Sequence, residues 1–334
     1  MSSLTRNIFF AVGLVAIVIM VLGFDVSFVE LWQQLCAAGY WLLPIIGMWL
    51  PLYMLNALAW RVIILGSGPC PVSYWRLVKI TVSAFALNYA TPVGLLGGEP
   101  YKILEMKNDI GPERASSSVL LFAMMHVFSH IWYWLTAVAL YIALLPVNVG
   151  EGMLLALVAT FCVAVIYLFV KGYRDGMVIK LLHLLGRLPG CRAWAERYEQ
   201  QNGRRLADID HQIAALHAQN RVSFYTSFFL EYIGRVLQSF EIFFMLLLFG
   251  AADASAMTFV HAFIILAFTS LFANMLFFIP LQLGGREGGF AMSVANMGFS
   301  GQVSMSVSLL CRVRELFWVA VGMALIKVGN KDSR

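Results

Sequence analysis

Long stretches without Lys, Arg, Asp or Glu set the main limit on what this chain can fold into. Such stretches are Ile8–Phe24, Tyr40–Trp60, Ala115–Gly150, Gly152–Val170, Ala254–Gly285 and Gly288–Cys311. A helix needs roughly 20 apolar residues to cross a hydrocarbon core of about 30 Å. With 60% hydrophobic and only 12% charged residues, the chain has too much apolar surface for one water-soluble core. We therefore predict an all-α polytopic membrane protein.

The distribution of basic residues predicts the orientation of the helices. Nine Lys and Arg residues lie between Lys171 and Arg221, whereas the connections Pro146–Gly152 and Ala251–Ala256 carry none. Cytoplasmic loops of membrane proteins are enriched in Lys and Arg. We therefore expect the 173–220 loop and both chain termini to lie on the cytoplasmic side of the cell inner membrane.

A helix-breaking signature occurs once in each half of the chain. The copies run from Asn88 to Glu99 and from Asn274 to Glu287, and each contains a proline followed by paired glycines. Loop charges and the number of crossings agree if each segment enters the membrane and returns to the face from which it came. The two segments then enter from opposite faces, as in an inverted-topology repeat. Paired breaks of this kind point to the substrate site of transporters.

The predicted architecture is a single transmembrane domain over residues 1–334, with about six spanning helices and two re-entrant broken segments. One half covers about 40–172 and the other about 221–328, and a cytoplasmic loop at 173–220 joins them. In this loop Met177–Leu188 has the pattern of an amphipathic surface helix. About 50 residues are too few for a catalytic domain of ordinary size, so any chemistry must lie in the membrane part.

The two broken segments and the last helix supply the candidate substrate-binding residues. Glycines free the backbone, and exposed N–H groups at a helix start can hold an anion such as a phosphate. Arg286, Arg312 and Arg314 are the predicted phosphate contacts, and Glu99 and Glu287 the predicted partners of a cationic headgroup or a coupled proton. The candidates are Asn88, Pro92, Gly97, Gly98, Glu99, Asn274, Pro280, Gly284, Gly285, Arg286, Glu287, Arg312 and Arg314.

A purely structural explanation of the same residues stands beside the functional one. Arg286 with Glu287, or Arg314 with Glu315, can neutralise one another, and glycine pairs allow helices to pack closely. Charged groups at bilayer depth cost about 2.5–3.5 kcal/mol each on insertion scales. We therefore expect these charges to be paired under either explanation.

A polar stripe on the 221–250 segment is a second candidate group. Glu231 and Arg235 are four residues apart, in the favourable order for a helical ion pair, and Gln238 and Glu241 roughly extend their face. This face must point into the protein. It lines a cavity on the path of a headgroup, or it holds two helices in register.

His126 and His130 have the same spacing in the first half and are a further candidate lining of the cavity. We expect them to contact a neighbouring carboxylate, such as Glu99 or Glu287. The pair lacks the glutamate of the HExxH pattern and a third ligand nearby in sequence. No metal site and no cofactor are therefore predicted.

The two signatures resemble a known family. Thr91–Glu99 reads TPVGLLGGE and Pro280–Gly289 reads PLQLGGREGG. Together with the downstream Cys311-Arg312 pair, these segments are similar to the transmembrane, flippase-like domain of the lysylphosphatidylglycerol synthase family, over about residues 10–328. Some single-domain relatives are hopanoid-associated. The family's Pro-Gly-x-Gly-Gly pattern is altered in both copies, which bears on the identity of the headgroup.

The resemblance implies a lipid translocase in which the headgroup crosses while the tails stay in the bilayer. We expect a flippase or transporter for a phospholipid-, isoprenoid- or hopanoid-type lipid. The aminoacyltransferase domain of the bifunctional synthases does not follow in this sequence, so we expect no lysine transfer. The alternatives are an intramembrane lipid-modifying enzyme, or a non-catalytic accessory subunit of a lipid or glycan synthesis pathway.

The sequence also indicates the partners of the protein. We expect a membrane lipid as substrate, and contact between the basic loops and anionic lipid headgroups at the cytoplasmic face. No nucleic-acid partner is expected, because the net charge of +5 lies mainly in those loops. Self-association and association with lipid-synthesis enzymes are both compatible with the sequence.

Overall fold

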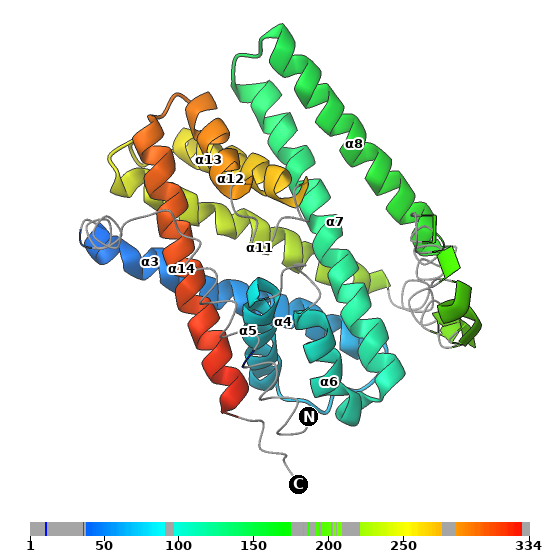
Figure 1. The fold of residues 1–334 in the computed structure, drawn as a ribbon. Helices are drawn as coiled ribbons and strands as arrows, with labels where there is room; N and C mark the ends of the chain where they lie inside the picture. The colour runs from blue at the N-terminus through cyan, green and yellow to red at the C-terminus, as the bar shows by residue number, and fades with distance from the viewer. Residues whose placement is uncertain are drawn as a thin grey trace.

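The computed structural model describes residues 38–90, 97–174, 221–275 and 285–328, with isolated positions at 11–36 and 183–208. Every regular element in these residues is a helix (Figure 1). The longer described helices are α3 (Leu42–Gly47), α4 (Trp49–Gly66), α5 (Tyr74–Ala90), α6 (Gly98–Ile110), α7 (Pro112–Leu144), α8 (Val149–Arg174), α11 (Arg221–Leu248), α12 (Ala256–Met275), α13 (Gly285–Asn296) and α14 (Gly301–Lys327).

Four stretches of helix are long and apolar enough to cross a membrane. They are Gly39–Gly66, Pro112–Leu144, Val149–Val170 and Ala256–Met275. The chain is therefore a multi-pass membrane protein. The expected total of about six spans stays a prediction, as does the division into halves around a 173–220 loop, most of which lies outside the described residues.

α11 and α14 are as long as the four candidate spans but carry more charge. They contain 28 and 27 residues, which at 1.5 Å per residue gives about 40 Å each. Away from the helix ends, their charged side chains are buried or half-buried: Glu231 and Arg314 are each 1% exposed. Both helices thus carry charge at positions where lipid does not reach it.

Local chemistry sets several helix boundaries. α7 begins with Pro112 directly after Gly111, whose φ of 85° suits glycine. α14 is capped by Ser300, whose hydroxyl accepts a hydrogen bond from the Val303 backbone N–H. These boundaries determine where the charged residues of α14 fall along the helix.

Each half contains a pair of helices interrupted at its signature. α5 packs against α6, and α12 packs against α13. The breaks at 91–96 and 276–284 lie outside the described residues, and so do Pro92, Pro280 and Gly284. In Figure 1 the α5–α6 pair lies in the lower part of the molecule and the α12–α13 pair in the upper part, with α4 and α11 crossing between them.

The first broken pair is held by contacts of the signature itself. The Asn88 side-chain oxygen accepts a hydrogen bond of 2.7 Å from the Gly98 backbone N–H, satisfying one of the unpaired N–H groups at the start of α6. A Cβ atom at Gly98 would lie 2.3 Å from the Ala84 carbonyl oxygen. Glycine is therefore required here for α6 to approach the backbone of α5.

The long helices connect the two halves. α4 packs against α11, α14 against α5, and α7 against α12. One apolar core gathers around α4, α5 and α6, and a second around α11, α12 and α13. α7 of the first half thus contacts α12 of the second broken pair, and α14 of the second half contacts α5 of the first broken pair. This exchange is compatible with an inverted repeat, which stays a prediction.

The contact between α14 and α5 depends on a small residue. A Cβ atom at Gly322 would lie 2.6 Å from both the Ala86 Cβ atom and the Val82 carbonyl oxygen. We predict that Gly322→Ala lowers the melting temperature of the detergent-solubilised protein, with a destabilisation of about 1–3 kcal/mol from overpacking. Gly47→Ala is the control, because nothing lies within 4 Å of a Cβ there. Equal melting temperatures for the two variants would contradict this packing.

Candidate functional site

Six ionised side chains meet where α13 begins, beside the middle of α14. We call this set the charge cluster, and its members are Glu241, Arg286, Glu287, Arg312, Arg314 and Glu315. α13 presents two of them in its first turn, α14 presents three within one turn, and α11 presents Glu241. The charge cluster contains all four arginines and glutamates proposed from the second signature and its downstream helix, together with Glu315 of the same helix and Glu241 of α11.

Glu315 is the common acceptor of the charge cluster. Its side chain is 0% exposed and accepts hydrogen bonds from Arg286 of α13 and, at 3.2 Å, from Arg312 one turn earlier on α14. The Arg314 guanidinium lies 3.5 Å from the same carboxylate. One buried anion thus holds three cations from two helices.

A second buried pair connects α14 to α11 and α4. Arg314 donates to Glu241 at 2.7 Å, with side chains 1% and 0% exposed. The Trp49 indole N–H donates to the other oxygen of Glu241 at 3.0 Å. The Arg314 guanidinium also lies 3.9 Å from the centre of a Trp49 ring, a distance suited to a cation–π contact.

Glu287 is the exposed member of the charge cluster. It accepts bonds of 3.0 and 2.7 Å from Arg312, and its side chain is 41% exposed while that of Arg312 is 3% exposed. The cluster is formally neutral with Glu287, since three arginines face three glutamates, and carries one positive charge without it. An anion that took the place of Glu287 would therefore meet an arginine already desolvated and held in position.

The two broken segments approach one another at the charge cluster. The Arg286 guanidinium donates to the hydroxyl of Tyr89, near the end of α5. Tyr89 belongs to the first signature and Arg286 to the second. One residue of each signature is thus in contact with one of the other.

Other candidates of the first signature have local roles. Glu99 pairs with Lys102 at 3.2 Å, one turn along α6, and the Lys102 ammonium lies 4.5 Å from the centre of the Phe122 ring. Gly97 and Gly98 form the start of α6. The described contacts of Glu99 therefore belong to the α6–α7 contact and not to the charge cluster.

The second signature likewise has residues with local contacts. The Asn274 amide donates at 2.7 Å to the Ser270 carbonyl, which lies one turn earlier on α12. Gly285 is buried at the first position of α13. The close approach of α13 to α12 occurs instead at Gly289, where a Cβ would lie 3.1 Å from the Thr269 Cα atom.

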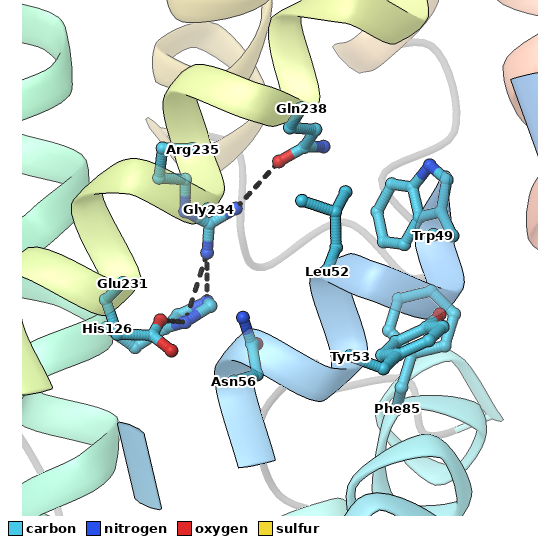
Figure 2. A pocket seen from close by; sticks show the side chains of 10 residues that line it. All are labelled: Trp49, Leu52, Tyr53, Asn56, Phe85, His126, Glu231, Gly234, Arg235 and Gln238. Carbon is cyan, nitrogen blue, oxygen red and sulfur yellow. Dashed lines mark hydrogen bonds and ion pairs between the residues drawn. The ribbon is translucent and has the colours of Figure 1, made fainter. Parts of the chain in front are cut away.

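A cavity of about 140 Å³ lies between α4, α7 and α11, and we call it the α4–α11 pocket. Its polar lining residues are Asn56, His126, Glu231, Arg235 and Gln238. The remaining lining is Trp49, Leu52, Tyr53, Phe85 and Gly234. Figure 2 shows the His126, Glu231 and Arg235 side chains on one side of the pocket and the three aromatic rings on the other.

His126 connects the two charged residues of the pocket. Its Nδ1 atom lies 2.7 Å from a Glu231 oxygen, and the Arg235 guanidinium contacts its ring from the other side. Arg235 also donates to the Gln238 side-chain oxygen at 3.1 Å. The expected contact with a neighbouring carboxylate is confirmed for His126, but the acid is neither Glu99 nor Glu287. The nearer acid is Glu231, because α11 packs directly on α7.

His130 lies beside this group. Its ring is 5.2 Å from that of His126 in an edge-to-face arrangement and 5.6 Å from that of Trp134. Within the described part of the chain, no set of three His, Cys, Asp or Glu side chains is grouped as a metal site would require. The two histidines thus belong to a packed polar layer between α7 and α11.

The sequence indicated the position of one member of these sites but not that of another. Glu241 was expected to point into the protein, because it extends the helical face of Glu231, Arg235 and Gln238. Trp49 gives no such signal, because a tryptophan in an apolar helix also suits a membrane interface. It nonetheless lines the α4–α11 pocket and contacts two members of the charge cluster.

The chain was compared with known families and proteins. The family described as the lysylphosphatidylglycerol synthase TM region matches residues 8–322, nearly all of the 334 residues, and the chain belongs to this family. No curated protein and no solved structure matched significantly. The family resemblance predicted from the two signatures is confirmed, and it indicates a lipid-related function in a membrane. A hopanoid association stays a prediction.

The buried pair of Arg314 and Glu241 generates a stability prediction. We expect Arg314→Met to destabilise the protein by about 3–5 kcal/mol, because it leaves a buried carboxylate without its ionic partner. The double variant Arg314→Met, Glu241→Gln should be more stable than the single one, because the uncompensated charge is gone. Thermal unfolding in detergent measures both differences.

The control for this prediction is an ion pair at the surface. Arg192 and Glu196 are 83% and 59% exposed and pair at 2.9 Å, so Arg192→Met should leave the melting temperature nearly unchanged. If Arg314→Met behaved like Arg192→Met, the charge cluster would not hold α14 to α11.

Proposed function

We propose that this member of the lysylphosphatidylglycerol synthase transmembrane family moves a lipid across the membrane by letting its phosphate-bearing headgroup pass the charge cluster. The lipid would be a phospholipid-, isoprenoid- or hopanoid-type lipid. The single observation that carries the proposal is the pair of Arg312 and Glu287, in which a nearly buried guanidinium is neutralised by a carboxylate that is 41% exposed.

The chemistry of this pair suits a headgroup phosphate. Arginine binds phosphate and carboxylate oxygens with the same planar set of N–H donors. A phosphate could therefore replace the Glu287 carboxylate as the acceptor of the Arg312 hydrogen bonds. Arg286 and Arg314 both contact the buried Glu315 carboxylate. Their positive charges favour a bound phosphate, and the negative charge of Glu315 offsets part of them.

The arrangement of the helices supports a path for the headgroup. In an inverted repeat of about six spans with two re-entrant segments, the broken segments would meet near the middle of the membrane. The contact between Tyr89 of the first signature and Arg286 of the second supports this arrangement. Non-helical backbone at membrane depth requires protein or water around it. A polar route past the charge cluster would let the headgroup cross while the lipid tails stay in the bilayer.

The remaining expectations complete this proposal. The protein would lie in the cell inner membrane with both termini in the cytoplasm, where its basic loops contact anionic headgroups. Association with lipid-synthesis enzymes would supply the protein with substrate. Self-association is a separate expectation. Neither is required for the exchange of Glu287 by a phosphate.

The competing function is an intramembrane lipid-modifying enzyme. One observation favours it: His126 is bonded to Glu231 beside a cavity, which resembles a base and its orienting carboxylate. Such an enzyme would also need a nucleophile, and the hydroxyl that lines the pocket belongs to Tyr53. Mass spectrometry of the lipids after incubation with the reconstituted protein separates the two functions, because transport leaves every lipid mass unchanged.

Leaflet exchange in liposomes tests the proposal. The full chain is reconstituted in vesicles of phosphatidylethanolamine and phosphatidylglycerol that contain fluorescent phosphatidylglycerol or a fluorescent polyprenyl phosphate. Added dithionite reports how fast the label reaches the outer leaflet. We expect Arg312→Gln to slow the exchange by roughly 10- to 100-fold, the range expected for a lost hydrogen bond to a charged group.

Glu287→Gln gives the sharper result. It removes the competitor for Arg312, so we expect faster exchange than in the unchanged protein. Arg76→Gln is the control, because it removes a partly buried ion pair with Asp109 that is not part of the charge cluster. We expect this variant to exchange lipid as fast as the unchanged protein. If Glu287→Gln slowed exchange as much as Arg312→Gln, the pair would be structural and the proposal wrong.

A further inference from the structure

One oxygen of Glu231 is left over in the α4–α11 pocket. The residue is 1% exposed, and its Oε2 atom bonds His126 at 2.7 Å. The Oε1 atom is buried without a hydrogen-bond partner in the described part of the chain. Buried polar atoms in native proteins are nearly always paired, so an unpaired one that lines a cavity calls for a partner from outside the chain.

The contacts of His126 determine what kind of partner this must be. The Arg235 guanidinium lies 2.5 Å from Nε2 of His126 and 3.1 Å from Nδ1, while Glu231 lies 2.7 Å from Nδ1. A guanidinium can only donate hydrogen bonds, so the nearer nitrogen, Nε2, is the acceptor that satisfies both neighbours. The other nitrogen, Nδ1, then carries the hydrogen and donates it to Glu231. Both Glu231 oxygens are acceptors in this arrangement, and the missing partner of Oε1 must donate a hydrogen bond.

The rest of the lining offers both donors and acceptors. The Tyr53 hydroxyl is a second buried polar atom without a partner in the described residues. The Asn56 and Gln238 amides also line the cavity, and Figure 2 shows both between the charged side and the aromatic side. A ligand that bonds several of these groups must itself carry more than one group that donates and accepts.

The charge of the lining argues against an ion. Glu231 contributes one negative charge and Arg235 one positive charge, and His126 is neutral in the arrangement above. Glu231 would attract an ammonium group, but Arg235 would repel it. Arg235 would attract a phosphate, but Glu231 would repel it. Hydroxyl groups satisfy the open acceptor without adding charge.

The opposite wall suits the C–H face of a polyol. The rings of Trp49, Tyr53 and Phe85 pack against one another with centroids 5.2–5.7 Å apart. They form a rigid apolar surface facing the polar groups. The cavity of about 140 Å³ has room for a ligand much larger than one water molecule.

We propose that the α4–α11 pocket binds a neutral polyol of the size of glycerol or a single sugar ring, with one hydroxyl donating to Glu231 Oε1. The polyol can be the headgroup of a lipid or a free molecule. Trp49 lines the pocket and also contacts Arg314 and Glu241 of the charge cluster, so a lipid headgroup in the pocket would lie close to the proposed phosphate site. The inference concerns binding only and stands whether or not the protein transports lipid.

Binding is measured by calorimetry on the purified full chain in two settings. In detergent the probes are glycerol and methyl glucoside. In nanodiscs of phosphatidylcholine the probes are phosphatidylglycerol, a glucosyl diacylglycerol and phosphatidylethanolamine. We expect the hydroxylated headgroups to bind more tightly than phosphatidylethanolamine. For the uncharged probes the affinity should not change with salt. Competition by the free polyols would identify the hydroxyls as the recognised group, and binding of the lipids alone would identify the source as a headgroup.

Two variants locate the binding. Glu231→Gln places an amide where an acceptor is needed and should weaken binding by about tenfold or more, as one lost hydrogen bond to a charged group would. Tyr53→Phe removes one hydroxyl with little change of shape and should weaken binding less, which keeps the test usable if the first variant does not fold. Glu113→Gln makes the same substitution at an exposed residue on α7 and should bind like the unchanged protein.

Three results would overturn the inference. Preferential and salt-sensitive binding of phosphatidylethanolamine would make the pocket a cation site. Absence of binding by every probe would mean that the cavity holds ordered water only. Unchanged polyol binding in folded Glu231→Gln protein would place the polyol elsewhere. Because no transport is measured, failure here leaves the liposome test of the charge cluster unaffected.

Discussion

The carboxylate of Glu315 is the interaction on which the centre of this protein depends. It is completely buried in a helix of a lipid-embedded chain and is contacted by Arg286, Arg312 and Arg314. None of these charges could be held there alone, because burying an ion costs several kcal/mol unless close partners offset it. The start of α13 and the middle of α14 must therefore stay together, and the first signature joins them through Tyr89.

The same constraint bears on the function proposed for the charge cluster. Its fully buried members, Glu241 of α11 and Arg314 and Glu315 of α14, pair with one another and with Arg286 of α13, which leaves little freedom to rearrange. Glu287 differs from them, because its side chain is 41% exposed. A rigid interior with one exchangeable anion is suited to receiving a phosphate in a medium that offers no water. The α4–α11 pocket adjoins it through Trp49, so phosphate and polyol chemistry lie next to each other in the fold.

Much of this could be predicted from the sequence. Uncharged stretches gave the multi-pass helical class, and two glycine- and proline-containing signatures gave the family and the arginines of the second half. The ion-pair partners of these arginines could not be predicted from the sequence. Glu241 and Arg314, for example, are 73 residues apart, and they meet only because of the way in which α11 crosses α14. Glu99 was expected to share the site with Arg286, yet it pairs locally with Lys102, since the i, i+3 spacing on α6 offers a nearer partner. His126 likewise meets Glu231 only because α7 packs on α11.

The account makes one central claim: a lipid phosphate takes the place of Glu287 at Arg312. The most direct measurement is a cryo-electron microscopy structure of the full chain in nanodiscs of phosphatidylglycerol. The account predicts phosphate density within hydrogen-bond distance of the Arg312 guanidinium, with Glu287 turned away and the contacts of Glu315 unchanged. An intact pair of Arg312 and Glu287, with phosphates found only around the outer surface of the helices, would contradict it.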